Sequence, residues 1–241
     1  MTQRADIALV ERGYFASRAK AREAIDAGLV TLDGRLVTKP SEPVAEDAFL
    51  AAAQPYPWVS RGGVKLAAAL DTFAIDPSGK HVLDVGASTG GFADVLLTRG
   101  AAHVTCVDVG QGQLHPKIGG DPRVTSLEKR DARSLTAADL PVLPELVVCD
   151  VSFISLALVL PPALALAAPQ AEAVLLIKPQ FEVGPDNVKK GVVRDIKARE
   201  RACAKIESVV EELAWRILGL MPSPIEGGDG NREFLLGARR P

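Results

Sequence analysis

Four short apolar runs, rich in β-branched residues, constrain the fold of this chain more than any other feature. They begin at His81, His103, Leu143 and Ala173, and each is followed by a helix-like or glycine-rich stretch. Two more strand-like runs, AWRILGLMPSPI and REFLLGARRP, come after a helical segment near the end of the chain. Strands that alternate with helices are typical of a parallel sheet covered on both faces. The pattern therefore predicts an α/β fold with an open, doubly wound sheet.

A pair of prolines separates this region from the part of the chain that precedes it. Pro55 and Pro57 disfavour helix and favour a stiff connector. The length of 241 residues suits one large core with a small appendage, because domains run to roughly 100–200 residues. We therefore expect a small domain over residues 1–54, a linker over 55–60 and the large α/β domain over 61–241.

The N-terminal segment has the signals of a small α+β domain. Ser17 can cap a helix, apolar or small residues recur after it at helical spacing, and Gly28 can end the helix in the left-handed conformation. The run LVTLDGRLV then alternates in polarity on both sides of Asp33 and Gly34, which is the strongest short-range signal for a hairpin. The segment is therefore predicted to fold as helices followed by a tight hairpin.

This segment resembles the small RNA-binding module named after ribosomal protein S-four, through the pattern SRxxAxxxIxxGxV that starts at Ser17. Residues 1–50 hold seven Lys or Arg against eight Asp or Glu, so the segment is not basic overall. Its cations cluster instead, and those four residues apart share one helical face. Such a face suits RNA phosphates, with a merely solvated helix face as the alternative. The candidate RNA-binding residues here are Arg12, Arg18, Lys20 and Arg22.

Composition excludes several classes of protein. Hydrophobic residues make up 47% and charged residues 24% of the chain, which is typical of globular proteins. The three cysteines are widely spaced and predict neither a disulfide framework nor a zinc site, so we expect reduced thiols, a cytoplasmic location and no metal. The most apolar stretch, residues 151–177, is interrupted by three prolines, and the first residues lack the apolar region of a signal peptide. We therefore expect no stable membrane insertion.

The turn after the first apolar run, residues 84–92, is the predicted ligand-binding loop. In open α/β sheets ligands bind beyond the carboxyl ends of the strands, and three glycines in DVGASTGGF let the backbone approach a ligand closely. The spacing matches neither the GxGxxG loop of nicotinamide enzymes nor the GxxxxGK[ST] phosphate loop. Asp84 would repel a pyrophosphate, so a cationic ligand is favoured.

Two further acidic residues are expected at the ends of the next strands. Asp108 lies 22 residues after Gly86, where a carboxylate typically binds ribose hydroxyls. Asp131, in the segment KRDAR, is expected to end a third strand between the runs that begin at His103 and Leu143, and to accept an adenine amino group. The runs at Leu143 and Ala173 are then the fourth and fifth strands. Together these features resemble the S-adenosylmethionine pocket of Rossmann-type methyltransferases. The resemblance implies that the cofactor is bound by Asp84, Gly86, Ala87, Ser88, Thr89, Gly90, Gly91, Phe92, Asp108, Val109, Asp131 and Asp150.

The residues that follow the fourth and fifth strands indicate the kind of methyl acceptor. The fourth strand is followed neither by the [DN]PP[YF] motif of amino-methylating enzymes nor by the Cys-Pro pair of C5-pyrimidine enzymes. Lys178 ends the fifth strand, where partial desolvation favours a neutral amine that can take a proton from a hydroxyl. Lys65, in a helix before the first strand, and Glu233, at the start of the last strand, are expected to converge with it.

In order and in motif context, Lys65, Asp150, Lys178 and Glu233 resemble the K-D-K-E tetrad of the FtsJ-like ribose 2'-O-methyltransferases. With WVSRGGVKL, DVSFIS, KPQFE and KKGVVRD, nearly the whole chain resembles the TlyA or hemolysin A family of ribosomal RNA methyltransferases. The resemblance implies methyl transfer from S-adenosylmethionine to a ribose 2'-hydroxyl, with cytidine as the target nucleoside. It also implies that Lys178 removes or helps to release the hydroxyl proton. Lys65 and Glu233 would then orient the hydroxyl and tune Lys178, and Asp150 would align Lys178 or favour the sulfonium.

A basic segment follows the proposed base. Residues 178–201 hold seven Lys or Arg against four Asp or Glu, in a protein whose net charge is -2. Aromatic residues are only 5% of the chain, so shape and phosphate contacts are expected to outweigh base stacking. The expected partners are ribosomal RNA or ribosomal subunits. The further candidate RNA-binding residues are Arg61, Lys189, Lys190 and Arg194.

Two other functions are alternatives to the methyltransferase. One is a membrane-active hemolysin, the activity that the family's name records, but the sequence predicts no membrane-spanning segment. The other is an RNA-binding ribosome assembly factor without catalytic activity, against which the presence of all four tetrad residues argues.

Overall fold

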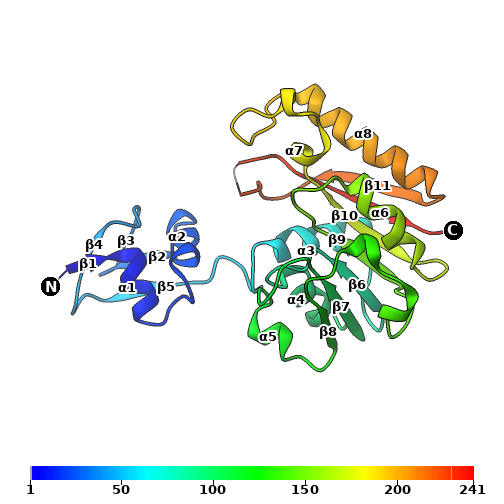
Figure 1. The fold of residues 1–241 in the computed structure, drawn as a ribbon. Helices are drawn as coiled ribbons and strands as arrows, with labels where there is room; N and C mark the ends of the chain where they lie inside the picture. Colours follow the sequence, from blue (N-terminus) through cyan, green and yellow to red (C-terminus); the bar gives the residue numbers. More distant parts are fainter. Residues whose placement is uncertain (1, 229) are drawn as a thin grey trace. The chain divides into compact units, whose positions relative to one another are not determined.

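The computed structural model describes residues 2–228 and 230–241 and divides into two compact units, Met1–Pro57 and Trp58–Pro241. The smaller unit is drawn in blue to cyan in Figure 1, and the remaining colours belong to the larger unit. Each unit has its own buried cluster of apolar side chains, and the larger unit has two such clusters.

The smaller unit packs two helices against short antiparallel strands. One pair of strands joins β1 to β4, and a three-stranded sheet has the order β3-β2-β5. The elements are β1 (Thr2–Arg4), α1 (Ala5–Glu11), α2 (Arg18–Asp26), β2 (Val30–Leu32), β3 (Arg35–Leu36), β4 (Pro43–Ala45) and β5 (Leu50–Ala52). The sequence did not predict β1, β4 and β5, because strands of three residues are too short to show a periodic pattern and no turn signal like Asp33–Gly34 marks these strands.

The helix and hairpin predicted in this unit are confirmed. The side chain of Ser17 accepts a hydrogen bond from the backbone N–H of Lys20, which caps α2, and Gly28 follows that helix at φ +71°. Asp33 and Gly34 join β2 to β3 with φ values of +50° and +79°. Two consecutive left-handed residues are what a type I′ hairpin turn requires, and that is why Asp-Gly is favoured there.

The larger unit contains the predicted doubly wound sheet, with the strand order β11-β12-β10-β9-β6-β7-β8. The five adjacent strands β10, β9, β6, β7 and β8 are parallel to one another, whereas β12 is antiparallel to both of its neighbours. The strands are β6 (His81–Val85), β7 (His103–Val107), β8 (Val124–Leu127), β9 (Leu146–Cys149), β10 (Glu172–Ile177), β11 (Arg216–Pro222) and β12 (Phe234–Arg239).

Helices cover both faces of this sheet because successive residues of a strand point to opposite sides. In β9, Val147 and Cys149 belong to one buried cluster, which also holds side chains of α6 and α8. Leu146 and Val148 belong to the other cluster, which holds side chains of α3 and α4. The helices are α3 (Gly62–Phe73), α4 (Gly91–Thr98), α5 (Pro116–Gly119), α6 (Leu156–Ala165), α7 (Pro179–Glu182) and α8 (Ile196–Glu212), with short 3-10 turns at Ala132–Ser134, Ala137–Asp139 and Pro185–Asn187.

Candidate active site

The loop between β6 and α4 is fixed closely against the neighbouring strands. Gly86 has φ +83°, and a Cβ atom there would lie 2.3 Å from the backbone oxygen of Asp150. The backbone N–H groups of Gly86 and Ala87 both donate to the carbonyl of Val107, at 2.9 and 3.2 Å. Only glycine allows this close approach of two backbones, so the loop forms a shallow cradle above the ends of β6, β7 and β9.

Two neighbouring cavities open along this loop. The tetrad cavity, about 550 Å³, is lined by all four residues of the predicted tetrad, and the Asp108 cavity, about 620 Å³, is lined by Asp108, Val109 and Asp131. Both volumes are within the range of small-molecule sites, roughly 300–1,000 Å³. The walls that the two cavities share are Gly86, Ser88, Asp150, Ser152 and Phe153. A ligand that lies across the loop would therefore extend from one cavity into the other.

The Asp108 cavity has one carboxylate held in place by the backbone. Asp108 follows β7 directly and accepts hydrogen bonds from the N–H groups of Ser88 at 2.8 Å and Gly110 at 2.7 Å. Ser88 itself has φ +46°, so the loop bends to reach this carboxylate. These contacts fix the Asp108 side chain at the carboxyl end of the sheet, beside the exposed Val109.

The expectation that Asp131 ends the third strand is wrong. β8 ends at Leu127, and Asp131 lies four residues later, where it caps a 3-10 turn by accepting from the N–H of Arg133. The guanidinium of Arg133 lies 2.6 Å from the Asp131 carboxylate and holds the pKa of that carboxyl below its usual value. Asp131 still lines the Asp108 cavity, but as one half of a partly exposed ion pair.

Most of the other loop residues line the tetrad cavity, and one of them packs in the protein interior. Ala87, Ser88, Thr89, Gly91 and Phe92 line the tetrad cavity, whereas Gly90 lines neither cavity. A Cβ atom on Gly90 would lie 2.9 Å from Leu114 and 3.1 Å from Ile118, so this glycine is needed for packing against α5.

Asp84 does not line either cavity, contrary to the expectation that it faces a cationic ligand. The side chain is fully buried at the end of β6, and neither carboxylate oxygen has a side-chain partner in the described part of the chain. Burial, reinforced by Asp150 and Asp108 and opposed by the N–H of Ala93, raises the pKa of Asp84 to about 8. At neutral pH the Asp84 carboxyl is therefore mostly protonated, and it would attract a cationic ligand from beneath the loop only by releasing that proton.

Lys65 and Glu233 form a buried ion pair in the tetrad cavity. Lys65 is on α3, Glu233 precedes β12, and Lys65 Nζ lies 2.5 Å from Glu233 Oε2. The two side chains are only 6% and 3% exposed. In so dry a setting each charge depends on the other, because an unpaired ion would be costly to bury.

Lys178 and Asp150 form the second ion pair of the same cavity. Asp150 follows β9 and Lys178 follows β10, so the parallel register of the two strands brings them together. Lys178 Nζ lies 2.5 Å from Asp150 Oδ1 and donates to Ser152 Oγ at 2.7 Å. These side chains are 12% and 20% exposed, so the pair is more open to solvent than Lys65 and Glu233.

Phe153 is a candidate site residue that the sequence reasoning missed. It has φ +64°, which is strained for a bulky side chain, and it is 92% exposed although it lines both cavities. Its ring lies near that of Phe181, with centroids 5.3 Å apart. An aromatic residue shortly after the strand that leads to Asp150 was the available signal, but the strained backbone is visible only in the structure.

The candidate RNA-binding residues of the smaller unit differ in their surroundings. The guanidinium of Arg12 donates to the backbone carbonyls of Ala45, Glu46 and Ala48, so it fastens α1 to the loop after β4. The guanidinium groups of Arg18 and Arg22 both contact the carboxylate of Asp6. For Lys20 the backbone N–H bonds to Ser17, and its side chain is partly buried. Arg12 therefore has a structural role that charge patterning did not predict.

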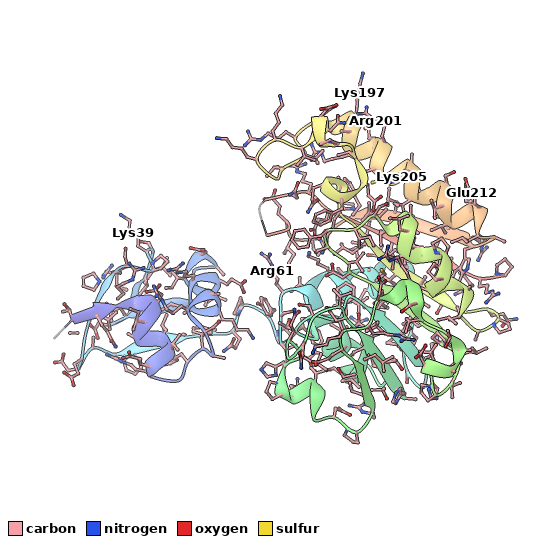
Figure 2. The ribbon with its side chains drawn as sticks, in the orientation of Figure 1. Lys39, Arg61, Lys197, Arg201, Lys205 and Glu212 are labelled. Carbon is pink, nitrogen blue, oxygen red and sulfur yellow. The ribbon has the colours of Figure 1, made fainter. Side chains whose placement is uncertain are left out.

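Three of the four candidate RNA-binding residues of the larger unit line the tetrad cavity or adjoin residues that line it. Arg61 lines the cavity, and so do Val188 and Gly191, which flank the exposed Lys189 and Lys190. Lys190 and Gly191 have φ values of +51° and +79° and form a tight turn that presents the two lysines. Arg194 is also exposed. Figure 2 shows the side chain of Arg61, together with further cations along α8.

The three cysteines are free, as their wide spacing predicts, and all three are buried. Burial raises the pKa of the Cys149 thiol well above its usual value, so Cys149 is a poor candidate for a nucleophile. Among residues 2–228 and 230–241, no helix is both long and apolar enough to cross a membrane.

Comparison with known proteins gives matches over the whole chain. The FtsJ-like methyltransferase family model matches residues 58–240, and the S4 domain model matches residues 3–50. The 16S/23S rRNA (cytidine-2'-O)-methyltransferase TlyA of Mycobacterium tuberculosis is 46% identical over 239 residues, which cover 98% of this chain and 89% of that protein. Hemolysin A of Brachyspira hyodysenteriae is 37% identical over 92% of this chain and 94% of its own length. A solved structure of a hemolysin-named protein from Streptococcus thermophilus has a TM-score of 0.79 at 37% identity and covers 99% of this chain and 88% of that chain.

Proposed function

The chain belongs to the FtsJ-like methyltransferase family, and from that premise we propose that it methylates the ribose 2'-hydroxyl of a ribosomal RNA nucleotide, with S-adenosylmethionine as donor. Cytidine is the proposed nucleoside, since the M. tuberculosis relative is named for methylation of cytidine. The observation that supports this most is the pairing of Lys65 with Glu233 and of Lys178 with Asp150 in one cavity.

The residues around the glycine loop fit S-adenosylmethionine. The cradle at Gly86 leaves no room for a Cβ atom, and the fully buried Asp84 lacks a side-chain partner in the described part of the chain, as suits a site for a cationic ligand. Asp108 and Val109 would hold the nucleoside part in the Asp108 cavity, and Ser88 lies where the two cavities meet. When bound, S-adenosylmethionine supplies an electrophilic methyl group on its sulfonium.

The two ion pairs of the tetrad cavity can prepare a hydroxyl for attack. In the proposed reaction Lys178 acts as a neutral amine and takes the proton that leaves the 2'-oxygen, while Asp150 and Ser152 hold that amine in place. The ammonium that forms is then stabilised by its ion pair with Asp150. The buried pair Lys65 and Glu233 orients the hydroxyl. Most of the acceleration would come from positioning the reactants, which contributes up to about 7–11 kcal/mol in ideal intramolecular reactions.

Phe153 supports the placement of a nucleotide base at the mouth of this site. Its ring is almost fully exposed between the two cavities and is backed by Phe181. Stacking of one base on an aromatic ring contributes roughly 1–3 kcal/mol. We therefore assign Phe153 the role of a stacking surface for the target base, although the low aromatic content argues against stacking along an extended single strand.

The charge pattern of α8 supports an RNA-facing surface beside the tetrad cavity. Residues 197–205 of this helix carry four cations, Lys197, Arg199, Arg201 and Lys205, against the single acid Glu200, whereas residues 206–212 carry only acidic charges, at 207, 211 and 212. Figure 2 shows Lys197, Arg201 and Lys205 along the helix, with Glu212 toward its other end. Cations near the start of a helix oppose its dipole, by about 0.3–1 kcal/mol each. A helix selected for stability alone would have the opposite gradient, so we assign this surface, with Lys189, Lys190 and Arg194, to RNA phosphates.

We further propose that residues 1–54 anchor folded ribosomal RNA, that 55–60 link the domains and that 61–241 carry out catalysis. The S4 domain match over residues 3–50 supports this division. A chain without residues 1–54 is expected to bind RNA more weakly and to bind the donor as the full chain does. Unchanged RNA affinity of the shortened chain would contradict this assignment.

The proposed function is tested by transfer of a labelled methyl group to purified ribosomal subunits and to naked ribosomal RNA. The labelled nucleoside is then identified by digestion and mass spectrometry, and 2'-O-methylcytidine is the expected product. Label on a base would refute the reaction class. RNA binding without any transfer would favour the assembly factor, and lysis of erythrocytes without RNA methylation would favour the hemolysin.

A further inference from the structure

Three arginines surround one buried carboxylate in the smaller unit. Asp6, in the first turn of α1, is fully buried, and its carboxylate contacts arginines from β1 and α2. Asp6 Oδ1 lies 2.9 Å from Arg4 Nε, and Asp6 Oδ2 lies 2.9 Å from Arg18 NH2 and 3.1 Å from Arg22 Nε. The sequence brings only Arg18 and Arg22 onto one helical face, so the convergence of all three on Asp6 is a tertiary feature.

The charges in this cluster do not balance. One arginine would neutralise Asp6, whereas three leave a net charge of +2 on the cluster. The arginines keep the pKa of the Asp6 carboxyl far below its usual value, so the carboxylate stays ionised. The three guanidinium groups repel one another, and only one of them is needed to neutralise Asp6. A purely structural ion pair would not need the other two.

The cluster also presents donors to solvent. The side chains of Arg4, Arg18 and Arg22 are 43%, 50% and 49% exposed. A guanidinium has five N–H donors, and the hydrogen bonds to Asp6 use only the Nε and NH2 groups. The NH1 groups of these three side chains make no hydrogen bond within the described part of the chain. Planar guanidinium groups held in this way match phosphate oxygens.

We propose that Asp6 is a positioning residue that holds Arg4, Arg18 and Arg22 as one preorganised binding site for a phosphodiester of structured RNA. This proposal rests on the proposed function, since it takes ribosomal RNA as the partner. Asp6 acts through the arginines: it repels the phosphate, but it fixes three flexible side chains before RNA arrives. Binding then loses less side-chain entropy than it would with three free arginines.

The sign of the effect of Asp6→Asn separates this proposal from simple electrostatics. The substitution removes a negative charge, so attraction of RNA by overall charge predicts tighter binding. Preorganisation predicts weaker binding, by about tenfold, because three arginine side chains would have to be ordered on binding. The measurement is filter binding of purified ribosomal RNA to the full chain over a series of salt concentrations.

Two further variants keep the test decisive. Asp47→Asn makes the same charge change at an exposed position of the same unit, and its RNA affinity should equal or slightly exceed that of the wild type. The triple variant Arg4→Gln, Arg18→Gln, Arg22→Gln should bind RNA more weakly, and its salt slope should fall by about one for each phosphate that it no longer binds. Adding Asp6→Asn to the triple variant should weaken RNA binding no further.

The outcomes distinguish a structural role from a positioning role. With the fold of the smaller unit checked by NMR, RNA binding by Asp6→Asn as tight as that of the wild type would overturn the proposal. If Asp6→Asn unfolds the unit, the triple variant decides, and wild-type RNA affinity in a folded triple variant would overturn it equally. In methyl-transfer assays, Asp6→Asn is expected to raise the KM for RNA and to leave kcat at saturating RNA unchanged. A wild-type chain that neither binds nor methylates RNA would instead refute the proposed function.

Discussion

The buried Asp84 makes the stability of the larger unit depend on pH in an unusual direction. A carboxyl group whose pKa is raised to about 8 in the fold is protonated there at neutral pH, whereas in the unfolded chain it is ionised. At pH values between the unfolded and the folded pKa of Asp84, the folded state holds one proton that the unfolded chain has lost. Stability from this group is therefore fully present in acid, decreases as pH rises through the neutral range and is lost above the folded pKa. Asp84→Asn removes this dependence, because the amide does not titrate.

The magnitude follows from the size of the pKa shift. Each pH unit between the unfolded and folded pKa values is equivalent to about 1.4 kcal/mol. At about pH 7 the wild-type Asp84 therefore destabilises the fold by up to about 4 kcal/mol relative to acid, as an order of magnitude. Between about pH 5.5 and about pH 7.5, the free energy of unfolding of Asp84→Asn should rise relative to that of the wild type by about 3 kcal/mol.

The assay is urea unfolding followed by tryptophan fluorescence. Both tryptophans of the chain, Trp58 and Trp215, belong to the larger unit, so the signal reports on that unit alone. Glu211→Gln, which neutralises an exposed carboxylate on α8, is the matched control, and its difference from the wild type should be nearly independent of pH. A difference between Asp84→Asn and the wild type that stays constant over this range would refute the reasoning. Binding of the cationic donor should also release a proton from the wild type and less from Asp84→Asn, as measured by calorimetry in buffers of different ionisation enthalpy.

Three further predictions concern the walls of the site. Gly86→Ala should abolish donor binding in calorimetry, because its Cβ would lie 2.3 Å from a backbone oxygen. Gly112→Ala, whose Cβ would have nothing within 4 Å, should bind the donor normally. Equal donor affinities of the two variants would contradict this prediction. Lys65→Met should lower the free energy of unfolding by roughly 3–5 kcal/mol, because it leaves the Glu233 carboxylate buried without its partner. Addition of Glu233→Gln should restore part of the loss, because it removes that unpaired charge. Purely additive losses would argue against the coupled pair. Phe153→Ala should slow RNA methylation with little change in stability, since loss of stacking is equivalent to about 1–3 kcal/mol, and Phe153→Trp should retain activity; equal rates for Phe153→Ala and the wild type would exclude stacking.

Local patterns predicted most of the fold. The apolar runs that start at His81, His103 and Ala173 became β6, β7 and β10, because their β-branched residues are buried on both faces of a parallel sheet. Ser17 and Asp33–Gly34 also behave as predicted, since caps and hairpin turns depend on only a few neighbouring residues. The short strands β1, β4 and β5 could not be predicted, since their formation depends on pairing with distant segments.

The site could be predicted less completely than the fold. The position of Asp131 was wrong because strand β8 ends where its pairing with β7 ends, and no residue of the KRDAR segment marks that point. The burial of Asp84 and the partners of Arg12 depend on contacts between residues far apart in the chain. For the same reason the sequence predicted that four tetrad residues would converge, but not that they would form two separate ion pairs.

The most direct test of the account is single-turnover methyl transfer by Lys178→Ala with bound RNA and saturating donor. The account predicts transfer at least roughly a hundred-fold slower than in the wild type, the lower range of general acid–base effects, with donor affinity nearly unchanged. Methyl transfer by Lys178→Ala at a rate comparable to that of the wild type would contradict the central claim that this lysine accepts the 2'-hydroxyl proton.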